Sequence, residues 1–152
     1  MVGEWVETVE YPQAPSMTEE EVKSLFDEAL FARLATLNLD GTVHVAPIFF
    51  KYLDDEIWIA TQDPSLKIRN IKRNNKVSVL VDVSDAPFKA ALVYGTATLD
   101  YDDVINKRIA IFERTRSRAE AEDYARKLSG KWKCVIVRVK PERIVSFDYS
   151  KF

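Results

Sequence analysis

Apolar and polar residues alternate along several short segments of the chain, which is the pattern of β-strands with one buried face. The clearest case is the run from Val77 to Val83, in which every second residue is valine. Two late strands are expected on either side of Pro141. Short runs of Asn, Asp and Gly separate neighbouring segments, which favours antiparallel strands in hairpin order. The other strand-like segments are residues 31–39, 43–53, 57–61 and 89–99.

Helical periodicity interrupts this order of strands. A capping box at Thr18 and Glu21 predicts a helix from about residue 19 to residue 30. Another helix follows Asp63, and two more are expected between residues 102 and 130. The helices beyond residue 30 therefore come after the third and fifth strands of the hairpin order. The pattern predicts a mainly β fold, a six- or seven-stranded antiparallel barrel with helices on its outside.

Length and composition fit one globular domain. The chain has 152 residues, of which 47% are hydrophobic, enough for a sizeable core. Residues 1–18 alternate only weakly and contain two prolines, so we expect an extended arm there, followed by a single domain at residues 19–152.

Charge and cysteine content exclude several classes of protein. A formal net charge of -2 gives no overall attraction to nucleic acid or to a membrane. Cys134 and His44 are the single cysteine and the single histidine, so neither a disulfide nor a structural zinc site is expected. No signal-peptide pattern and no apolar run of membrane-spanning length occur. We expect a cytoplasmic protein that neither spans a membrane nor binds nucleic acid.

The stretch EIWIATQDPSLKIRNIKRNNKVSVLV combines a strand, a helix start and a local positive charge. Asp63 is the expected N-cap and Pro64 the first helical residue, which leaves the next backbone amides unpaired. Such a helix start favours anions. We therefore predict a seat for a phosphate group, with Lys67 as the charge and Ser65 and Thr61 as hydroxyl donors. The Asp63 carboxylate opposes this unless it turns away, and the alternative is a surface helix whose basic face is solvated.

Other residues with chemical potential each have a structural explanation as well. His44 fits a strand residue that faces solvent, and Cys134 fits a small core residue. Lys51 ends an otherwise apolar strand segment, where it either approaches a ligand or marks the place where the strand reaches the surface. Three large flat side chains could flank a planar ligand or pack in the core or an interface, namely Trp58, Tyr94 and Trp132.

The segment ARLATLNLDGTVHVAPIFFKYLDDEIWIATQDPSLKIRNIKRNNKVSVLV, followed by ALVYGTATL and KWKCVIVRVKPERIVSFD, resembles the pyridoxamine 5'-phosphate oxidase-like FMN-binding split barrel family. The resemblance covers about residues 19–149 and implies a split β-barrel. It also implies a homodimer that binds FMN, or a related deazaflavin coenzyme, between its subunits.

The resemblance also implies which residues contact the cofactor. Ser65, Leu66 and Lys67, together with Ala60 and Thr61, would hold the phosphate. The strand segment Ala46, Pro47, Ile48, Phe49 and Lys51 would pass the flavin ring, with the Lys51 ammonium near N1 and O2 of the ring. Trp132 is the further candidate for a flat side chain against the cofactor.

Two departures from the family pattern bear on the substrate. Ala46 and Leu66 stand where the oxidase itself has arginines, and no arginine-rich segment follows the last strand. We therefore expect a flavin-type site but not pyridoxamine phosphate as the substrate, which the sequence does not identify. The expected function is a flavin-dependent oxidoreductase that uses a small-molecule substrate or electron donor. The alternative is a carrier that binds flavin, deazaflavin or haem without turnover, since no catalytic acid or base can be named.

Overall fold

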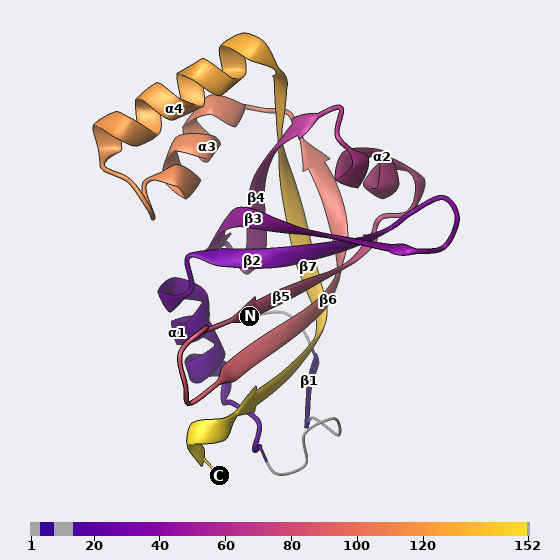
Figure 1. Ribbon diagram of the computed structural model, residues 1–152, viewed down its shortest axis with the longest axis vertical. Coiled ribbons are helices and arrows are strands. Elements are labelled where there is room, and N and C mark those ends of the chain that lie inside the picture. Colours follow the sequence, from indigo (N-terminus) through magenta and orange to yellow (C-terminus); the bar gives the residue numbers. More distant parts are fainter. Residues whose placement is uncertain (1–3, 8–13, 152) are drawn as a thin grey trace.

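Six antiparallel strands close into a barrel in the computed structural model, which describes residues 4–7 and 14–151 (Figure 1). The strand order is β7-β4-β3-β2-β5-β6, and pairing of β6 with β7 closes the barrel. A seventh strand, β1 (Glu4–Glu7), pairs in parallel with β7. The predicted mainly β fold is thus confirmed. The barrel strands are β2 (Phe31–Leu37), β3 (Val43–Leu53), β4 (Glu56–Asp63), β5 (Lys76–Asp82), β6 (Lys89–Asp100) and β7 (Lys133–Asp148).

The alternation in the sequence places one face of each strand in the barrel interior. On β5, Val77, Val79 and Val81 are buried, whereas the residues between them are partly exposed. The hairpin between β3 and β4 turns at Asp54 and Asp55, which both have positive φ, as a tight two-residue turn requires. These local signals explain why the strands were predictable.

The late strand pair predicted around Pro141 is instead the single strand β7, so this prediction was wrong. Pro141 lies opposite Gly95 of β6, and the pairing shifts there by one residue, because Tyr94 pairs with Arg143. A bulge lets a strand continue through a proline, which cannot donate a ladder hydrogen bond. Gly95 is needed at this point, because a Cβ on it would lie 2.5 Å from the Lys140 carbonyl oxygen.

The four α-helices of the described residues lie outside the barrel (Figure 1). The predicted capping box of α1 is confirmed, since Thr18 and Glu21 each bond the other's backbone amide. Helices α3 and α4 form a hairpin between β6 and β7 and pack on each other (Figure 1). The helices are α1 (Glu19–Glu28), α2 (Leu66–Arg73), α3 (Val104–Phe112) and α4 (Arg118–Lys131), and a short 3-10 helix, η1 (Tyr149–Lys151), follows β7.

Arg114, just beyond α3, fastens the end of α1 to the barrel. Its guanidinium donates to the backbone oxygens of Phe26, Asp27 and Ala29, and also to Phe50 O at 2.7 Å. The last carbonyls of a helix have no partner within it, so this arginine caps α1 from a distant part of the chain. The helical hairpin is thereby held against β3.

Within the described residues, no helix has both the length and the apolar character needed to cross a membrane. The same residues contain no group of three or more His, Cys, Asp or Glu side chains that could hold a metal ion. Of the predicted N-terminal arm, residues 1–3 and 8–13 lie outside the described part.

Candidate functional site

Helix α2 begins at Leu66, and its N-cap is Ser65. The predicted N-cap at Asp63 was therefore wrong by two residues. Ser65 makes no side-chain capping bond, and its Oγ is buried without a hydrogen-bond partner. Because the first amides of a helix have no partner within it, the start of α2 offers donors to an anion.

The Asp63 carboxylate turns away from this helix start. Its Oδ2 accepts hydrogen bonds from Tyr101 Oη at 2.8 Å and Lys72 Nζ at 3.1 Å. The bond from Tyr101, followed by that from Lys72, holds the pKa of Asp63 below its ordinary value. The negative charge of Asp63 is thus neutralised by Lys72, within α2. This removes the objection to an anion at the helix start.

A buried amide fixes α2 on the barrel. Asn70 is fully buried and donates to Thr36 Oγ1 at 3.0 Å and to Asn38 Oδ1 at 2.9 Å, both on or next to β2. Its own oxygen accepts from Arg73 at 2.8 Å. Since Thr36 is buried and Asn38 is half-buried, the bonds from Asn70 determine the orientation of α2 on the barrel.

A cavity of about 160 Å³ lies between the middle of β3, the end of β4, helix α2 and the α3–α4 hairpin. Lys67 lines it and forms no hydrogen bond or ion pair with the described residues. Burial lowers the pKa of the Lys67 ammonium from its ordinary value. Such a cation gains most from an anion brought in from outside the chain. The lining residues are Pro47, Ile48, Phe49, Ala60, Thr61, Gln62, Lys67, Arg108, Phe112, Tyr124 and Leu128.

Arg108 of α3 supplies a second cation to this cavity. Its side chain is 1% exposed, and Nη1 donates to the Thr61 carbonyl oxygen at 2.7 Å. Its Nε is buried and has no hydrogen-bond partner. Burial lowers the pKa of this guanidinium as well. The cavity therefore contains two positive side chains and, among its lining residues, no carboxylate.

Aromatic rings form the wall of the cavity on the side of the helical hairpin. Phe112 packs edge-on against Phe49 and Tyr124, with ring centroids 5.8 and 4.8 Å apart. The Arg116 guanidinium lies 4.2 Å from the centre of the Tyr124 ring and covers this cluster. These contacts hold the helical hairpin against the middle of β3.

The structure brings together six of the eleven residues predicted to contact a cofactor, namely Pro47, Ile48, Phe49, Ala60, Thr61 and Lys67. The remaining five do not line this cavity. Ala46 and Lys51 lie on β3 to either side of it, and Ser65 lies at the start of α2. Leu66 faces a separate hollow beside the β2–β3 turn, and Trp132, at the end of α4, is 51% exposed. Their contact with a ligand stays a prediction.

Sequence reasoning missed the residues that α3 and α4 contribute, above all Arg108. A signal for it was present, because Arg108 lies on the same helical face as Ile105 and Phe112. A charged residue inside an apolar stripe is buried only at a cost, so it points to a partner or a ligand. Tyr124 and Leu128 carried no comparable signal, since each fits an ordinary core stripe.

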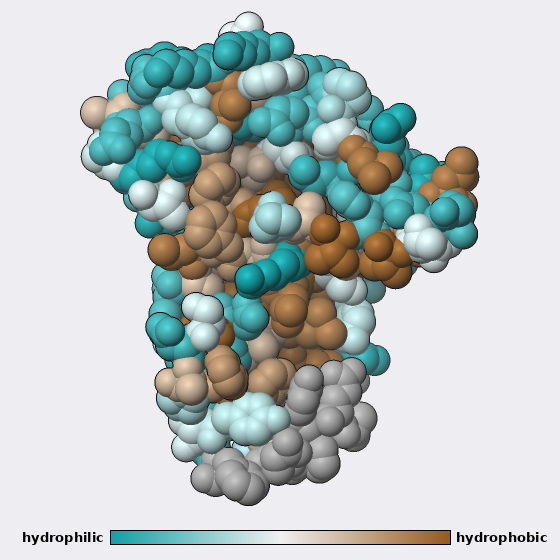
Figure 2. All heavy atoms as spheres, in the orientation of Figure 1, coloured by the Kyte–Doolittle hydropathy of each residue, from teal (hydrophilic) through white to brown (hydrophobic). Residues whose placement is uncertain are grey.

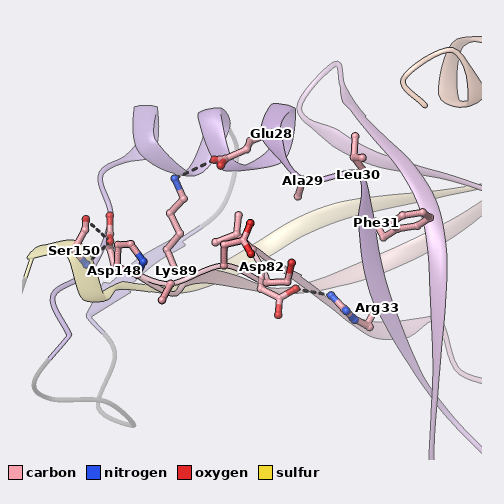
Figure 3. A pocket seen from close by; sticks show the side chains of 14 residues that line it. Glu28, Ala29, Leu30, Phe31, Arg33, Asp82, Lys89, Asp148 and Ser150 are labelled. Atoms are coloured by element: carbon pink, nitrogen blue, oxygen red, sulfur yellow. Dashed lines mark hydrogen bonds and ion pairs between the residues drawn. The ribbon is translucent and has the colours of Figure 1, made fainter. Parts of the chain in front are cut away.

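A larger cleft of about 670 Å³ lies between the end of α1, β2 and the turn from β5 to β6. Figure 3 shows that its two cationic side chains, Arg33 and Lys89, are each paired with a carboxylate. Arg33 bonds Asp82 at 2.5 Å and Lys89 bonds Glu28 at 3.0 Å. Because these charges are already neutralised, the cleft offers no comparable attraction to an anion.

Solved structures with the same fold have diverse roles. The conserved hypothetical protein Rv2991 from Mycobacterium tuberculosis superposes with a TM-score of 0.79 at 25% identity, over 89% of this chain and 87% of its own. An F420 reductase superposes with a TM-score of 0.64 at 24% identity, over 80% of this chain and 94% of its own. HutZ, a haem storage protein from Vibrio cholerae, superposes with a TM-score of 0.69 at 18% identity, over 86% of this chain and 94% of its own. The last two similarities show the fold alone.

No curated protein matches the sequence. The profile of the family described as pyridoxamine 5'-phosphate oxidase, in contrast, matches residues 18–147, which is most of the chain. This confirms the resemblance drawn from the strand, the helix start and the returning strand. The chain therefore belongs to the pyridoxamine 5'-phosphate oxidase family.

Proposed function

We propose that the protein is a flavin-dependent oxidoreductase that binds FMN, with the FMN phosphate in the cavity at the start of α2. The observation that carries this proposal is the presence of Lys67 and Arg108 in one small cavity without a carboxylate among its lining residues. A phosphate monoester carries a charge of about -1.5 to -2 at pH 7, which two cations and a helix start balance. The buried, unpaired Nε of Arg108 fits such a ligand as well.

The size of the cavity supports a site shared between two copies of the chain. At about 160 Å³ it is smaller than the roughly 300 Å³ or more of a pocket that encloses a drug-sized ligand. The phosphate therefore enters the cavity, while the flavin ring lies outside it along β3. A second subunit covers the exposed side of the ring in this arrangement.

The surface beside the cavity is apolar, as a dimer interface requires. Figure 2 shows apolar side chains gathered across the middle of the face on which β2 and β3 lie. Phe31 and Leu37 of β2 and Val43 and Val45 of β3 point to the outside of the barrel and are 38–64% exposed. An apolar patch of this kind marks an interaction site. We therefore propose a homodimer through the outer face of β2 and β3.

A bound flavin would supply two-electron chemistry at its N5 atom. The residues of this chain bind, orient and shield it. Lys67 and the start of α2 hold the phosphate, Arg108 fixes α3 to β4, and the ring cluster around Phe112 closes the cavity from water. Pro47 has no amide hydrogen, so the backbone donors toward a ligand on this part of β3 come from Ile48 and Phe49.

The alternative is a carrier that binds a flavin, a deazaflavin or haem without turnover. One observation favours it: Lys67, Arg108 and Tyr124 are the titratable residues that line the cavity, and none of them is an ordinary general base at neutral pH. Haem fits this cavity less well than FMN. His44, the chain's single histidine and the usual haem ligand, is not among the lining residues.

The test of the proposed function is binding of FMN, deazaflavin coenzyme and haem to the purified protein, followed by absorbance spectroscopy. We expect twin flavin bands with FMN and a loss of FMN affinity of about tenfold or more in Lys67→Ala. The melting temperature of the protein without FMN should stay nearly unchanged, because Lys67 has no partner among the described residues. Equal FMN affinity in Lys67→Ala would defeat the phosphate assignment. A Soret band with no flavin binding would favour the haem carrier.

The same assay has a pH dependence with a defined sign. Burial lowers the pKa of Lys67, so its ammonium loses the proton at a lower pH than an ordinary lysine. Charge on Lys67 is present below that pKa and is lost above it. FMN affinity should therefore decline as pH rises toward the ordinary lysine pKa of about 10.4, whereas in Lys67→Ala this decline should be absent.

A further inference from the structure

Arg108 differs from two partly buried arginines, Arg114 and Arg138, in how few of its donors are used. Arg114 donates to four backbone oxygens, and Arg138 bonds the carboxylates of Glu56 and Asp100. Arg108 is more buried than Arg138, yet in the described part of the chain it makes one hydrogen bond, to Thr61 O, and no ion pair.

Such an arrangement is costly unless an anion arrives from outside. A guanidinium has five N–H donors, and a buried donor without a partner destabilises the protein. The Nε of Arg108 is such a donor, and the residue lines the cavity that Lys67 also lines. Packing against the Phe112 ring, 5.2 Å from the guanidinium carbon, holds the side chain in this position without neutralising it.

We infer that Arg108 binds the phosphate of the cofactor and, with Lys67, makes the cavity a site for a terminal phosphate monoester. This inference rests on the proposed function and adds a residue and a ligand class to it. Ala46 and Leu66 stand where arginines are expected from the family resemblance. Arg108 restores one positive charge from α3, a different part of the chain.

The charge and volume of the cavity both point to a terminal phosphate group. Two cations balance the dianion of a monoester, whereas a phosphodiester carries a single charge. A cavity of about 160 Å³ has the volume of about five water molecules, which suits a compact group at the end of a ligand. The ring and ribityl chain then extend away from α3.

Three flavins with the same ring separate the phosphate from the rest of the cofactor: riboflavin has no phosphate, FMN ends in a monoester, and FAD has a diphosphate that is closed at its far end by adenosine and therefore ends in no monoester. The intact protein and Arg108→Met are titrated with each, and binding is followed by flavin fluorescence. The intact protein should prefer FMN to both others. Arg108→Met should lose about tenfold or more of its FMN affinity while its riboflavin affinity stays within about twofold. Arg108→Lys, which keeps the charge, should recover part of the loss.

Arg114→Met is the matched control, because Arg114 is a half-buried arginine just beyond the end of α3 that bonds only backbone oxygens outside the cavity. It should lower the melting temperature and leave the ratio of FMN to riboflavin affinity unchanged. If Arg108→Met keeps the ratio of the intact protein, or Arg114→Met changes it equally, Arg108 has no phosphate role. Equal affinity of the intact protein for FMN and FAD would overturn the monoester assignment. An intact protein that binds none of the flavins would instead overturn the proposed function.

Discussion

Asp63 and Ser65 are both good N-cap residues, and the choice between them shows how a distant contact decides a local feature. The order of residues favours Asp63, because proline follows it. In the structure Tyr101 and Lys72 take the Asp63 carboxylate, and the helix starts two residues later. Tyr101 is 38 residues away, so no local pattern contains this information. The shift matters for function because it leaves the helix amides free of a carboxylate.

Lys51 carries the residue-scale prediction. It lies on β3 two residues beyond Phe49, and it forms no ion pair with the described residues. If FMN is cycled, a lysine near N1 of the ring stabilises the anionic reduced form more than the neutral oxidised form. Lys51→Met should then lower the two-electron midpoint potential of bound FMN by about 30 to 65 mV, equivalent to about 1.5–3 kcal/mol.

The measurement is a spectroelectrochemical titration of FMN bound to each protein. Lys127→Met, on the exposed face of α4, controls for loss of a positive charge in general. Midpoints that agree between the intact protein and Lys51→Met would remove the electronic role of Lys51 and leave the carrier as the better reading.

Among the secondary-structure elements, β6 and β7 can approach each other closely because residue 95 is glycine. The sequence of β6 contains Gly95, and a glycine inside a strand is typical of a bulge or a close backbone approach, both of which occur in the structure. The sequence could not indicate that the partner is the backbone at Lys140 and Pro141, because that pairing joins residues more than 40 positions apart. The position of a strand in the sequence is determined by alternation within a few residues, whereas its register depends on pairing with a strand that is distant in the sequence.

Gly95→Ala should destabilise the protein by about 1–3 kcal/mol, because the added Cβ meets the Lys140 carbonyl oxygen and neither backbone can move freely. Gly130→Ala is the matched control with the opposite sign. Gly130 lies within α4 with no atom within 4 Å of the added Cβ, so alanine should stabilise by about 0.5–1 kcal/mol. Urea unfolding of the two variants measures both. Equal free energies of unfolding for Gly95→Ala and the intact protein would show that the strands separate there at little cost.

On the scale of the whole molecule, the barrel was predictable and half of the cavity was not. Hairpin order and helix positions follow from local signals, and they sufficed for the closed barrel. Lys67 and Thr61 were found because one strand–helix segment contains them, and Phe49 was found through the family resemblance. Arg108 and Tyr124 were missed because the α3–α4 hairpin folds back onto that segment through contacts between distant residues, such as Arg108 with Thr61.

The molecule-scale prediction is a dimer whose mass in light scattering is twice 17.5 kDa. Val45→Glu should give monomers, since Val45 is 57% exposed on the apolar face and a two-fold axis would place two added carboxylates in one interface. The same variant should bind FMN more weakly, because the second wall of the site is lost. Val45→Thr, nearly the same shape, should stay dimeric. A mass of 17.5 kDa for the intact protein at micromolar concentration would refute the interface.

The position of β7 in the barrel determines when the barrel can close during synthesis. It bonds β4 on one side and β6 on the other, so it is the strand that closes the barrel. During synthesis, β4 and β6 emerge from the ribosome before residues 133–148 exist and therefore wait with unpaired edges. Exposed edges of this kind recruit other strands. A nascent chain that stalls within α4 should thus depend on chaperones. Once β7 has also emerged from the ribosome, it can pair with both open edges and close the barrel.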